Sequence, residues 1–284
     1  MSHDAPTLRV AGVQMDVELG DLAKNRARIL EGLNQAADAN AQLIVFPECA
    51  LCGYGFESRE EAFAHAEPLP GPSTLTLAEA CARRGVWAIV GMLEQEGDRL
   101  YNTCVLIGPT GLVGRYRKIH LPFMGVDRFT DPGTDPFALH EVEGVRVGMH
   151  ICYDGSFPES GRVLTLLGAD LLVLPTNWPV KTECAALHMV PCRAFENVVY
   201  MIAVNRVGQE RGTTFIGRSS VADPDGRVMA TAGWDSEELI LADIDAAKAR
   251  RKRLVRIAGK HEVDRIGDRR PAFYGELNRP ATSP

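Results

Sequence analysis

Residues 171–178 read Leu-Leu-Val-Leu-Pro-Thr-Asn-Trp, and residues 43–48 read Leu-Ile-Val-Phe-Pro-Glu. In each stretch a wholly apolar run of strand length ends at a proline, and polar or aromatic side chains follow. Strands without polar alternation are usually covered on both faces by other layers. Because such strands alternate here with amphipathic stretches, the sequence predicts a layered α/β domain with helices outside.

The other expected elements are separated by capping and turn residues. Asp21 is placed to cap a helix that continues to about residue 40, and Gly168 is placed to end another. No linker or break in composition divides the chain, so we expect one domain over residues 1–250 and a C-terminal extension over 251–284 that contributes to contacts between subunits. Helices are predicted at 72–84, 158–167 and 183–197, strands at 8–15, 86–92, 100–107, 112–116, 137–142, 145–151 and 199–205, and a hairpin turn at 223–226.

The composition narrows the classes of partner and compartment. A net charge of −6 argues against nucleic acid or an anionic membrane, because both favour a basic surface. No window approaches the run of about 20 apolar residues that spans a bilayer. The seven cysteines are scattered and odd in number, which indicates reduced thiols. The first residues, MSHDAPTLRVAG, lack the pattern of a secretion signal, so we expect a cytoplasmic protein.

Polar side chains follow four of the predicted strands. In layered α/β folds the chemistry collects beyond the carboxyl ends of strands. This rule selects Glu48, Lys118 and Cys152, and it also selects the neighbouring pair Asn177 and Trp178. These positions together form a candidate site.

Cys152 is the candidate nucleophile of this site. A free thiol has a pKa of about 8.5, so it needs either a cation that lowers its pKa or a base that accepts its proton. Lys118 is a candidate for the cation. Glu48, confined behind an apolar strand, is a candidate for the base, since partial burial raises the pKa of a carboxyl group.

Motifs in a fixed order make the interpretation more specific. They are Phe-Pro-Glu at 46–48, Gly-Tyr at 53–54, Tyr-Arg-Lys-Ile-His-Leu-Pro at 116–122, Pro-Gly at 132–133, Ile-Cys-Tyr-Asp at 151–154, Phe-Pro-Glu at 157–159, Pro-Thr-Asn-Trp at 175–178, Arg-Ala-Phe-Glu-Asn at 193–197 and Gly-Arg-Ser at 217–219. With these motifs the chain resembles the nitrilase superfamily of carbon–nitrogen hydrolases, from the first strand to the hairpin near Gly226.

The resemblance implies a fold and a mechanism. The fold is an αββα sandwich that pairs into homodimers or larger assemblies. The mechanism uses a Glu-Lys-Cys triad, with Cys152 as nucleophile, Glu48 as general base and then acid, and Lys118 beside the thiolate. It needs no metal or organic cofactor. The backbone N–H of Tyr153 and the Lys118 ammonium are expected to stabilise the oxyanion.

Two positions bear on the branch of the family and on the site. Relatives that bind acidic substrates often carry an arginine shortly after the nucleophile, where this chain has Gly155 and Ser156. Many relatives carry an additional glutamate after the lysine, and the nearest carboxylate here is Asp127, which we expect to assist by orienting Lys118 or the substrate. Arginines that could instead grip an acidic substrate are Arg128, Arg193 and Arg218.

The predicted function is hydrolysis of a small linear amide, and the sequence leaves alternatives open. These are an N-carbamoyl amine or amino acid hydrolase, a true nitrilase, and a catalytically silent scaffold of the same fold. Substrate contacts are expected from Tyr54, Tyr153, Asn177 and Trp178, although aromatic residues also fill cores.

Three other features have simpler interpretations. The Cys-x-x-Cys at 49–52 has no second pair with which to bind zinc, so packing is favoured. A cysteine–histidine dyad with His150 or His120 is conceivable, but buried histidines are favoured. The basic run at 248–253 is interpreted as a solvated helix face or a contact between subunits.

Overall fold

Alternate residues of the first strands enter two different hydrophobic layers. The structure, a computed structural model, describes residues 6–279, so the first five residues of the N-terminal stretch and the last five of the tail lie outside the described part. In β2 (Leu43–Val45), Leu43 and Val45 join the core between two sheets, whereas Ile44 joins the core beneath two helices. Because successive side chains of a strand point to opposite faces, both faces of β2 are buried, which explains its wholly apolar sequence.

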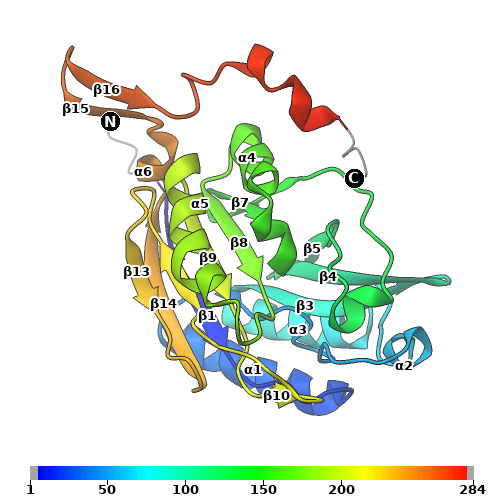
Figure 1. The fold of residues 1–284 in the computed structure, drawn as a ribbon. Helices are drawn as coiled ribbons and strands as arrows, with labels where there is room; N and C mark the ends of the chain where they lie inside the picture. Colours follow the sequence, from blue (N-terminus) through cyan, green and yellow to red (C-terminus); the bar gives the residue numbers. More distant parts are fainter. Residues whose placement is uncertain (1–5, 280–284) are drawn as a thin grey trace.

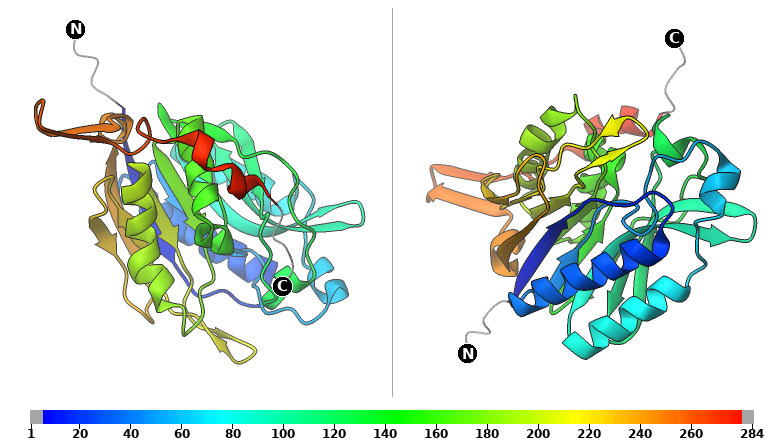
Figure 2. Two further views of the ribbon diagram at one scale, coloured as in Figure 1. Left: turned by 45° about the horizontal axis from the view of Figure 1, so that its top comes forward. Right: turned by 90° about the horizontal axis from the view of Figure 1, so that it is seen from below.

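The first sheet has six strands in the order β14-β1-β2-β3-β4-β5. β1, β2 and β3 are parallel, and the other neighbouring pairs are antiparallel. Helices α1 (Leu22–Asp38) and α3 (Pro72–Arg84) lie side by side across its outer face (Figure 2, right). The other strands of this sheet are β1 (Thr7–Gln14), β3 (Trp87–Glu96), β4 (Arg99–Gly108), β5 (Gly111–Arg117) and β14 (Glu238–Asp245).

The second sheet also has six strands, in the order β13-β12-β9-β8-β7-β6. Helices α4 (Pro158–Leu167) and α5 (Val190–Asn197) cover its outer face (Figure 1). Its strands are β6 (Leu139–Val142), β7 (Val145–Met149), β8 (Leu171–Pro175), β9 (Tyr200–Val204), β12 (Ser220–Ala222) and β13 (Val228–Thr231).

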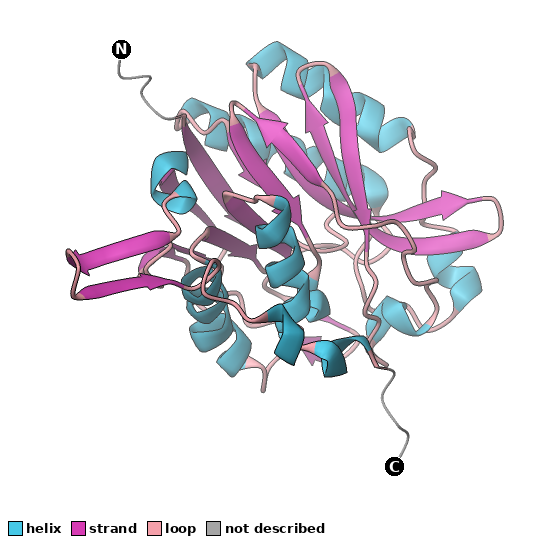
Figure 3. Ribbon diagram, turned by 90° about the horizontal axis from the view of Figure 1, so that it is seen from above, coloured by secondary structure: helices cyan, strands magenta, loops and turns pink. Residues whose placement is uncertain are grey.

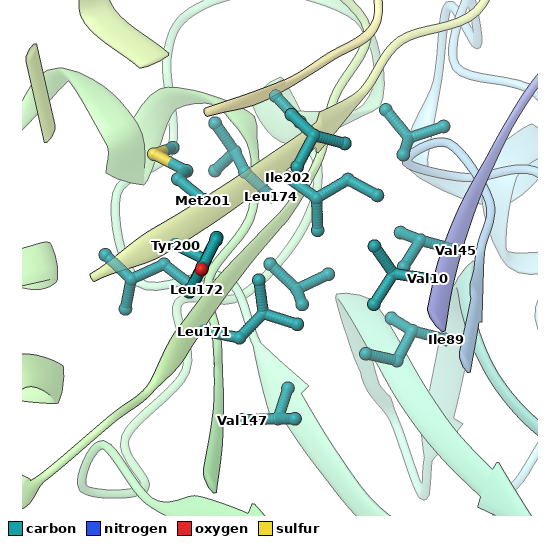
Figure 4. Packing of buried hydrophobic residues seen from close by; sticks show 14 of the residues in the cluster. Val10, Val45, Ile89, Val147, Leu171, Leu172, Leu174, Tyr200, Met201 and Ile202 are labelled. Atoms are coloured by element: carbon teal, nitrogen blue, oxygen red, sulfur yellow. The ribbon is translucent and has the colours of Figure 1, made fainter. Parts of the chain in front are cut away.

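The largest hydrophobic core fills the space between the inner faces of the two sheets and continues beneath α4 and α5. Val10, Val45 and Ile89 of the first sheet point toward the second sheet, where Leu171 and Ile202 lie (Figure 4). The order of layers is therefore helices, sheet, sheet, helices, and the predicted αββα sandwich is confirmed.

The ends of three helices agree with the bounds predicted from capping residues, prolines and glycines. Asp21 caps α1 by accepting a hydrogen bond from the backbone N–H of Lys24 at 2.9 Å. α3 and α4 have the predicted bounds, and each begins with a proline and ends before a glycine in the left-handed conformation.

The helix predicted at 183–197 is present over those residues, with one irregularity. It contains a π-helical turn, Ala185–Met189, that leads into α5. Pro191 lies in the first turn of α5, and because it has no N–H it cannot continue the regular hydrogen bonds of a preceding α-helix. No strand was predicted at 238–245, yet β14 pairs with β1 along its whole length. The short helix α2 (Arg59–Phe63) was not expected either.

The C-terminal segment stands outside the two large sheets. After α6 (Ala246–Arg250), strands β15 (Arg253–Ile257) and β16 (His261–Asp264) form a hairpin that projects from the sandwich (Figures 1 and 3). The chain then passes over α4, and the guanidinium of Arg265 lies 3.8 Å from the ring centroid of Phe195 on α5.

The basic run at 248–253 is largely neutralised within the chain. Lys248 forms ion pairs with Asp223 and Asp225, and Arg250 pairs with the buried Asp170. Lys252 donates hydrogen bonds to backbone carbonyls at the end of α5. Across residues 6–279, none of the helices has the length and apolar character needed to cross a membrane.

Truncation of a side chain between the sheets tests the core. Ile202→Ala removes a fully buried side chain, so we expect the free energy of unfolding to fall by about 2–5 kcal/mol. Leu75→Ala on α3, where the side chain is 57% exposed, is the matched control and should change it by less than about 1 kcal/mol. Equal losses in urea denaturation would contradict the assignment of the core.

Candidate active site

Glu48 lies on a tight turn at the end of β2. The turn passes directly over Gly91 of β3, where a Cβ atom would lie 2.4 Å from both the Cys49 nitrogen and the Pro47 oxygen. Cys49 has a positive φ of 51°, an uncommon conformation for a residue other than glycine. The strand end and the absent side chain at Gly91 together place the Glu48 carboxylate inside the protein, where the residue is 1% exposed.

Lys118 follows β5 and joins two carboxylates. Its Nζ lies 2.7 Å from Oε1 of Glu48 and 2.5 Å from Oδ2 of Asp127, and all three side chains are fully buried. Asp127 lies on a 3-10 turn, Gly125–Arg128. The structure therefore places Asp127 against Lys118 and not in a surface pair with Arg128.

Asn102, on β4, holds the two carboxylates at a fixed separation. Its Nδ2 donates to Oε1 of Glu48 and to Oδ1 of Asp127, at 2.8 Å in both cases. Asn102 was not among the residues predicted for the site. The signal was an amide side chain within an otherwise largely apolar strand, in a position that becomes fully buried.

Tyr54 completes the group that we call the charged cluster: Glu48, Lys118, Asp127, Asn102 and Tyr54. The Tyr54 hydroxyl donates to Oδ2 of Asp127 at 2.7 Å, and the Lys118 Nζ lies 5.9 Å from the centroid of its ring. Tyr54 is only 2% exposed. It was predicted to line the substrate pocket, and in the structure its polar group is engaged by Asp127.

Burial and neighbouring charges determine protonation in the charged cluster. Burial raises the pKa of Glu48 above its ordinary value; Lys118 opposes this shift and Asp127 adds to it. Burial alone would lower the pKa of Lys118, but Glu48 and Asp127 hold it well above its ordinary value. Lys118 therefore stays charged, and Glu48 is a stronger base than an exposed carboxylate.

Cys152 begins a 3-10 turn, Cys152–Ser156, just beyond β7. Its φ of +45° is a strained conformation for a residue with a side chain, and such strain is concentrated at functional sites. Burial raises the pKa of its thiol to about 12; Glu48 also raises it, and Lys118 lowers it. Lys118 therefore acts on the thiol in the predicted direction, but its effect does not offset that of burial. Transfer of the proton to a base fits the electrostatics.

Asp154 fixes the turn that carries Cys152. Its fully buried carboxylate accepts hydrogen bonds from the Ile151 N–H at 3.0 Å and the Tyr116 hydroxyl at 2.9 Å. The other oxygen accepts from the His120 N–H at 3.1 Å and lies 2.7 Å from the His120 ring nitrogen Nδ1. Since Tyr116 and His120 flank Lys118 in the chain, Asp154 ties the turn of Cys152 to the end of β5.

The two histidines have structural contacts. The His120 ring also stacks on Phe157, with centroids 3.8 Å apart. His150 is fully buried with Nδ1 3.3 Å from the Ser160 hydroxyl, and burial lowers its pKa to about 4. These contacts agree with the interpretation of both as packed histidines.

Asn177 and Trp178 follow β8 on the second sheet. The Asn177 side chain is 1% exposed, and neither its oxygen nor its nitrogen has a hydrogen-bond partner within the described part of the chain. The Asn177 backbone bonds to the Cys152 thiol and lowers its pKa. A buried amide with both groups unpaired beside the nucleophile is available to a ligand. Trp178 is fixed through its backbone to Asn205, and Tyr153 is 40% exposed with its ring edge-on to Phe157.

The Cys-x-x-Cys motif does not form a metal site in the described residues. Cys49 and Cys52 are buried free thiols, and the Cys49 sulfur lies 3.6 Å from Oδ1 of Asn102. Over residues 6–279, no group of three or more histidine, cysteine and acidic side chains is arranged to hold a metal ion. Packing behind the charged cluster accounts for both cysteines.

In this candidate site a buried carboxylate, Glu48, and a buried ammonium group, Lys118, lie near enough to the strained Cys152 to act on the pKa of its thiol. The family model for carbon-nitrogen hydrolases matches residues 9–254, so the chain belongs to the carbon–nitrogen hydrolase family and is an enzyme of that class. The resemblance to the nitrilase superfamily is confirmed.

Relatives match over nearly the whole chain. A nitrilase of Pyrococcus abyssi is 39% identical over 268 residues, which are 94% of this chain and 99% of that protein. An (R)-stereoselective amidase of a Pseudomonas species is 35% identical over 271 residues, covering 95% and 94%. The human omega-amidase is 32% identical over 254 residues, covering 85% and 90%.

Solved structures agree in fold. A mutant of the amidase from Nesterenkonia sp. AN1 in complex with butyramide has a TM-score of 0.79 and 23% identity, covering 95% of this chain and 97% of that one. A second mutant of that amidase, with the acetamide moiety of fluoroacetamide added covalently at the active site cysteine, has a TM-score of 0.80 and 22% identity, covering 97% and 98%. At this level of identity the likeness supports the αββα fold alone.

The pH dependence of alkylation tests the protonation state of Cys152. Because its pKa is about 12, its reaction with iodoacetamide should show no step near pH 8.5–9, where an ordinary thiol ionises. The alkylation rate should instead increase as the pH is raised through the pKa of Glu48. That increase should come below about pH 8.5 but above the usual carboxyl range, because the pKa of Glu48 is raised. Mass spectrometry of each peptide measures the reaction, and the exposed Cys184 and Cys192, alkylated in the same samples, are references for the reagent. A step near pH 8.5–9 in the Cys152 profile would contradict this account.

Substitution of Asp154 tests the support of the nucleophile turn. Asp154→Asn introduces an NH2 group where the carboxylate accepts hydrogen bonds, so we expect unfolding free energy to fall by about 1–3 kcal/mol and turnover to fall at least about tenfold. Glu159→Gln, at an exposed position seven residues from Cys152, is the matched control for denaturation and kinetics. Wild-type values for Asp154→Asn would show that the turn does not need this carboxylate.

Proposed function

We propose that the enzyme hydrolyses a small, uncharged amide to a carboxylic acid and ammonia through a thioester on Cys152. The observation that carries the proposal is the charged cluster, in which Glu48 has a raised pKa and one oxygen, Oε2, without a hydrogen-bond partner among the described residues. That oxygen is available to accept a proton from the thiol, whose pKa responds to the charge of Glu48.

In the first half-reaction the Cys152 sulfur attacks the amide carbonyl carbon while the thiol proton moves to Glu48. The carbonyl π electrons move to oxygen, and the Lys118 ammonium and the Tyr153 N–H stabilise the oxyanion, each well-placed donor contributing about 3 kcal/mol. The C–N bond then breaks as Glu48 returns the proton to nitrogen. Ammonia leaves, and the acyl group remains on sulfur.

In the second half-reaction water replaces ammonia. Glu48 takes a proton from water as the oxygen attacks the thioester, and the C–S bond breaks to release the acid. The proton held by Glu48 returns to the Cys152 sulfur, which restores the resting state. Asp127 keeps Lys118 charged throughout, since it contacts the ammonium opposite Glu48.

The arginines support an uncharged substrate. Arg128 donates to the carbonyls of Gly125 and Phe56, and Arg193 donates to the Gly155 carbonyl and pairs with Glu196. Arg218 lies 5.1 Å from the Trp234 ring centroid. Because each guanidinium has partners within the chain, an amide without a carboxylate is favoured over an N-carbamoyl amino acid. Among the candidate substrate classes, N-carbamoyl amines rank second and nitriles rank third.

We also propose a cytoplasmic location, supported by the cysteines. All seven are free thiols in the structure. An oxidising compartment would favour disulfides. The complete Glu-Lys-Cys set in one buried site likewise argues against a catalytically silent scaffold.

The decisive assay is ammonia release from a panel of short aliphatic amides, ω-amides, N-carbamoyl compounds and nitriles. We expect turnover of neutral amides, lost in Cys152→Ala and lowered at least about 100-fold in Glu48→Gln. Cys192→Ala removes an exposed thiol of α5 and should retain wild-type turnover. Neutral-amide turnover that persists in Cys152→Ala would refute the mechanism, and turnover of N-carbamoyl compounds alone would replace the proposed substrate class.

A further inference from the structure

We propose that Glu210 is a positioning residue for catalysis. Its carboxylate fixes the backbone of Tyr54, so that the Tyr54 hydroxyl holds Asp127 against Lys118. This inference rests on the amide hydrolysis proposed above, and it assigns a role in that chemistry to a residue outside the Glu-Lys-Cys set.

The Glu210 carboxylate is enclosed by the segment Gly53-Tyr54-Gly55. Oε2 accepts hydrogen bonds from the backbone N–H of Tyr54 at 2.9 Å and of Gly55 at 2.8 Å. A Cβ atom at Gly53 would lie 2.7 Å from Oε1 of Glu210, and Gly53 has a φ of +83°. The two glycines therefore allow the backbone to approach the carboxylate closely.

Arg206 holds Glu210 from the opposite side. Arg206 is fully buried and forms ion pairs with Glu210 and with Asp16, the latter at 2.7 Å. Its guanidinium also donates to the Val17 carbonyl at 2.8 Å and lies 4.4 Å from the ring centroid of Phe215. The buried charge of Glu210 is thus compensated, and its carboxylate is held between a cation and two N–H groups.

Tyr54 transmits this constraint to the charged cluster. Its carbonyl accepts from the Val126 N–H at 2.8 Å, and its ring fills the space beside Gly125, where a Cβ atom would lie 2.2 Å from the ring. Its hydroxyl bonds to Asp127, which bonds to Lys118. Glu210 is therefore linked to Lys118 by a continuous chain of direct hydrogen bonds that passes through Tyr54 and Asp127.

Glu210 connects two segments that leave different sheets of the sandwich. It ends β10 (Gln209–Glu210), which follows β9 of the second sheet in the chain (Figure 1). Tyr54 follows the turn of Glu48, which comes from the first sheet. A displaced Glu210 would leave the fold of each sheet intact but release the contact that aligns Tyr54 and Asp127 with Lys118.

The test is a double-mutant cycle with Glu210→Gln and Tyr54→Phe. Glu210→Gln should lower kcat for the amide about 10- to 100-fold and change KM less than about threefold, since the contact aligns the charged cluster and not the substrate. The double variant should be no more than about threefold slower than Tyr54→Phe, because both changes act through Asp127. Both single variants should slow alkylation of Cys152 by iodoacetamide to a similar extent.

Asp16→Asn is the matched control. It removes the other ion-pair partner of Arg206 and leaves the contact between Glu210 and Tyr54 in place. We expect a lower midpoint of thermal unfolding and a kcat within about twofold of wild type. If Glu210→Gln fails to fold, Glu210→Asp replaces it. This variant keeps the charge and withdraws the carboxylate by one methylene, and we expect the same loss in kcat.

Losses that multiply fully in the double variant, or wild-type kcat in a folded Glu210 variant, would overturn the inference. A wild-type enzyme that releases no ammonia would instead overturn the proposed function. In that case the alkylation rates of Cys152 still decide the role of Glu210, because they need no amide substrate, and equal rates in wild type and Glu210→Gln would refute it.

Discussion

The burial of two carboxylates around one ammonium group is the constraint on which this site depends. Glu48, Lys118 and Asp127 are fully buried, and any one of them alone would be strongly disfavoured inside the protein. Their mutual contacts, with Asn102 donating to both carboxylates, make the arrangement stable. Burial raises the pKa of Glu48, against the effect of Lys118 and with a further contribution from Asp127, so the buried arrangement also favours a base at Glu48.

The sandwich is what brings this base to a thiol. Glu48 and Lys118 follow strands of the first sheet, whereas Cys152 and Asn177 follow strands of the second. Packing of the two sheets through an apolar core aligns the strand ends, and the helices outside complete the burial (Figure 4). Asp154 and Glu210 add polar ties between the halves: Asp154 joins the Cys152 turn to the end of β5, and Glu210 joins β10 to the segment around Tyr54.

Local signals and strand ends could be interpreted from the sequence, and contacts between distant segments could not. Proline and glycine defined α3 and α4, and the rule of strand ends selected Glu48, Lys118, Cys152 and Asn177. β14 was not predicted, because its acidic residues are not typical of a buried strand and the strand forms by pairing with β1. The roles of Asn102, Asp154 and Glu210 were not predicted because each depends on a distant partner: Asp127 lies 25 positions from Asn102, Tyr116 lies 38 from Asp154, and Tyr54 lies 156 from Glu210. The pKa of Cys152 depends on burial, which no local pattern reports.

The central claim is that Glu48 removes the proton of a thiol that stays protonated at rest. Rapid-quench mass spectrometry of the Cys152 peptide during turnover of an amide measures this step directly. The account predicts a transient S-acyl adduct on Cys152 in the wild type, and formation slowed at least about 100-fold in Glu48→Gln. An adduct that forms at the wild-type rate in Glu48→Gln would contradict it, since the thiol would then ionise without this base.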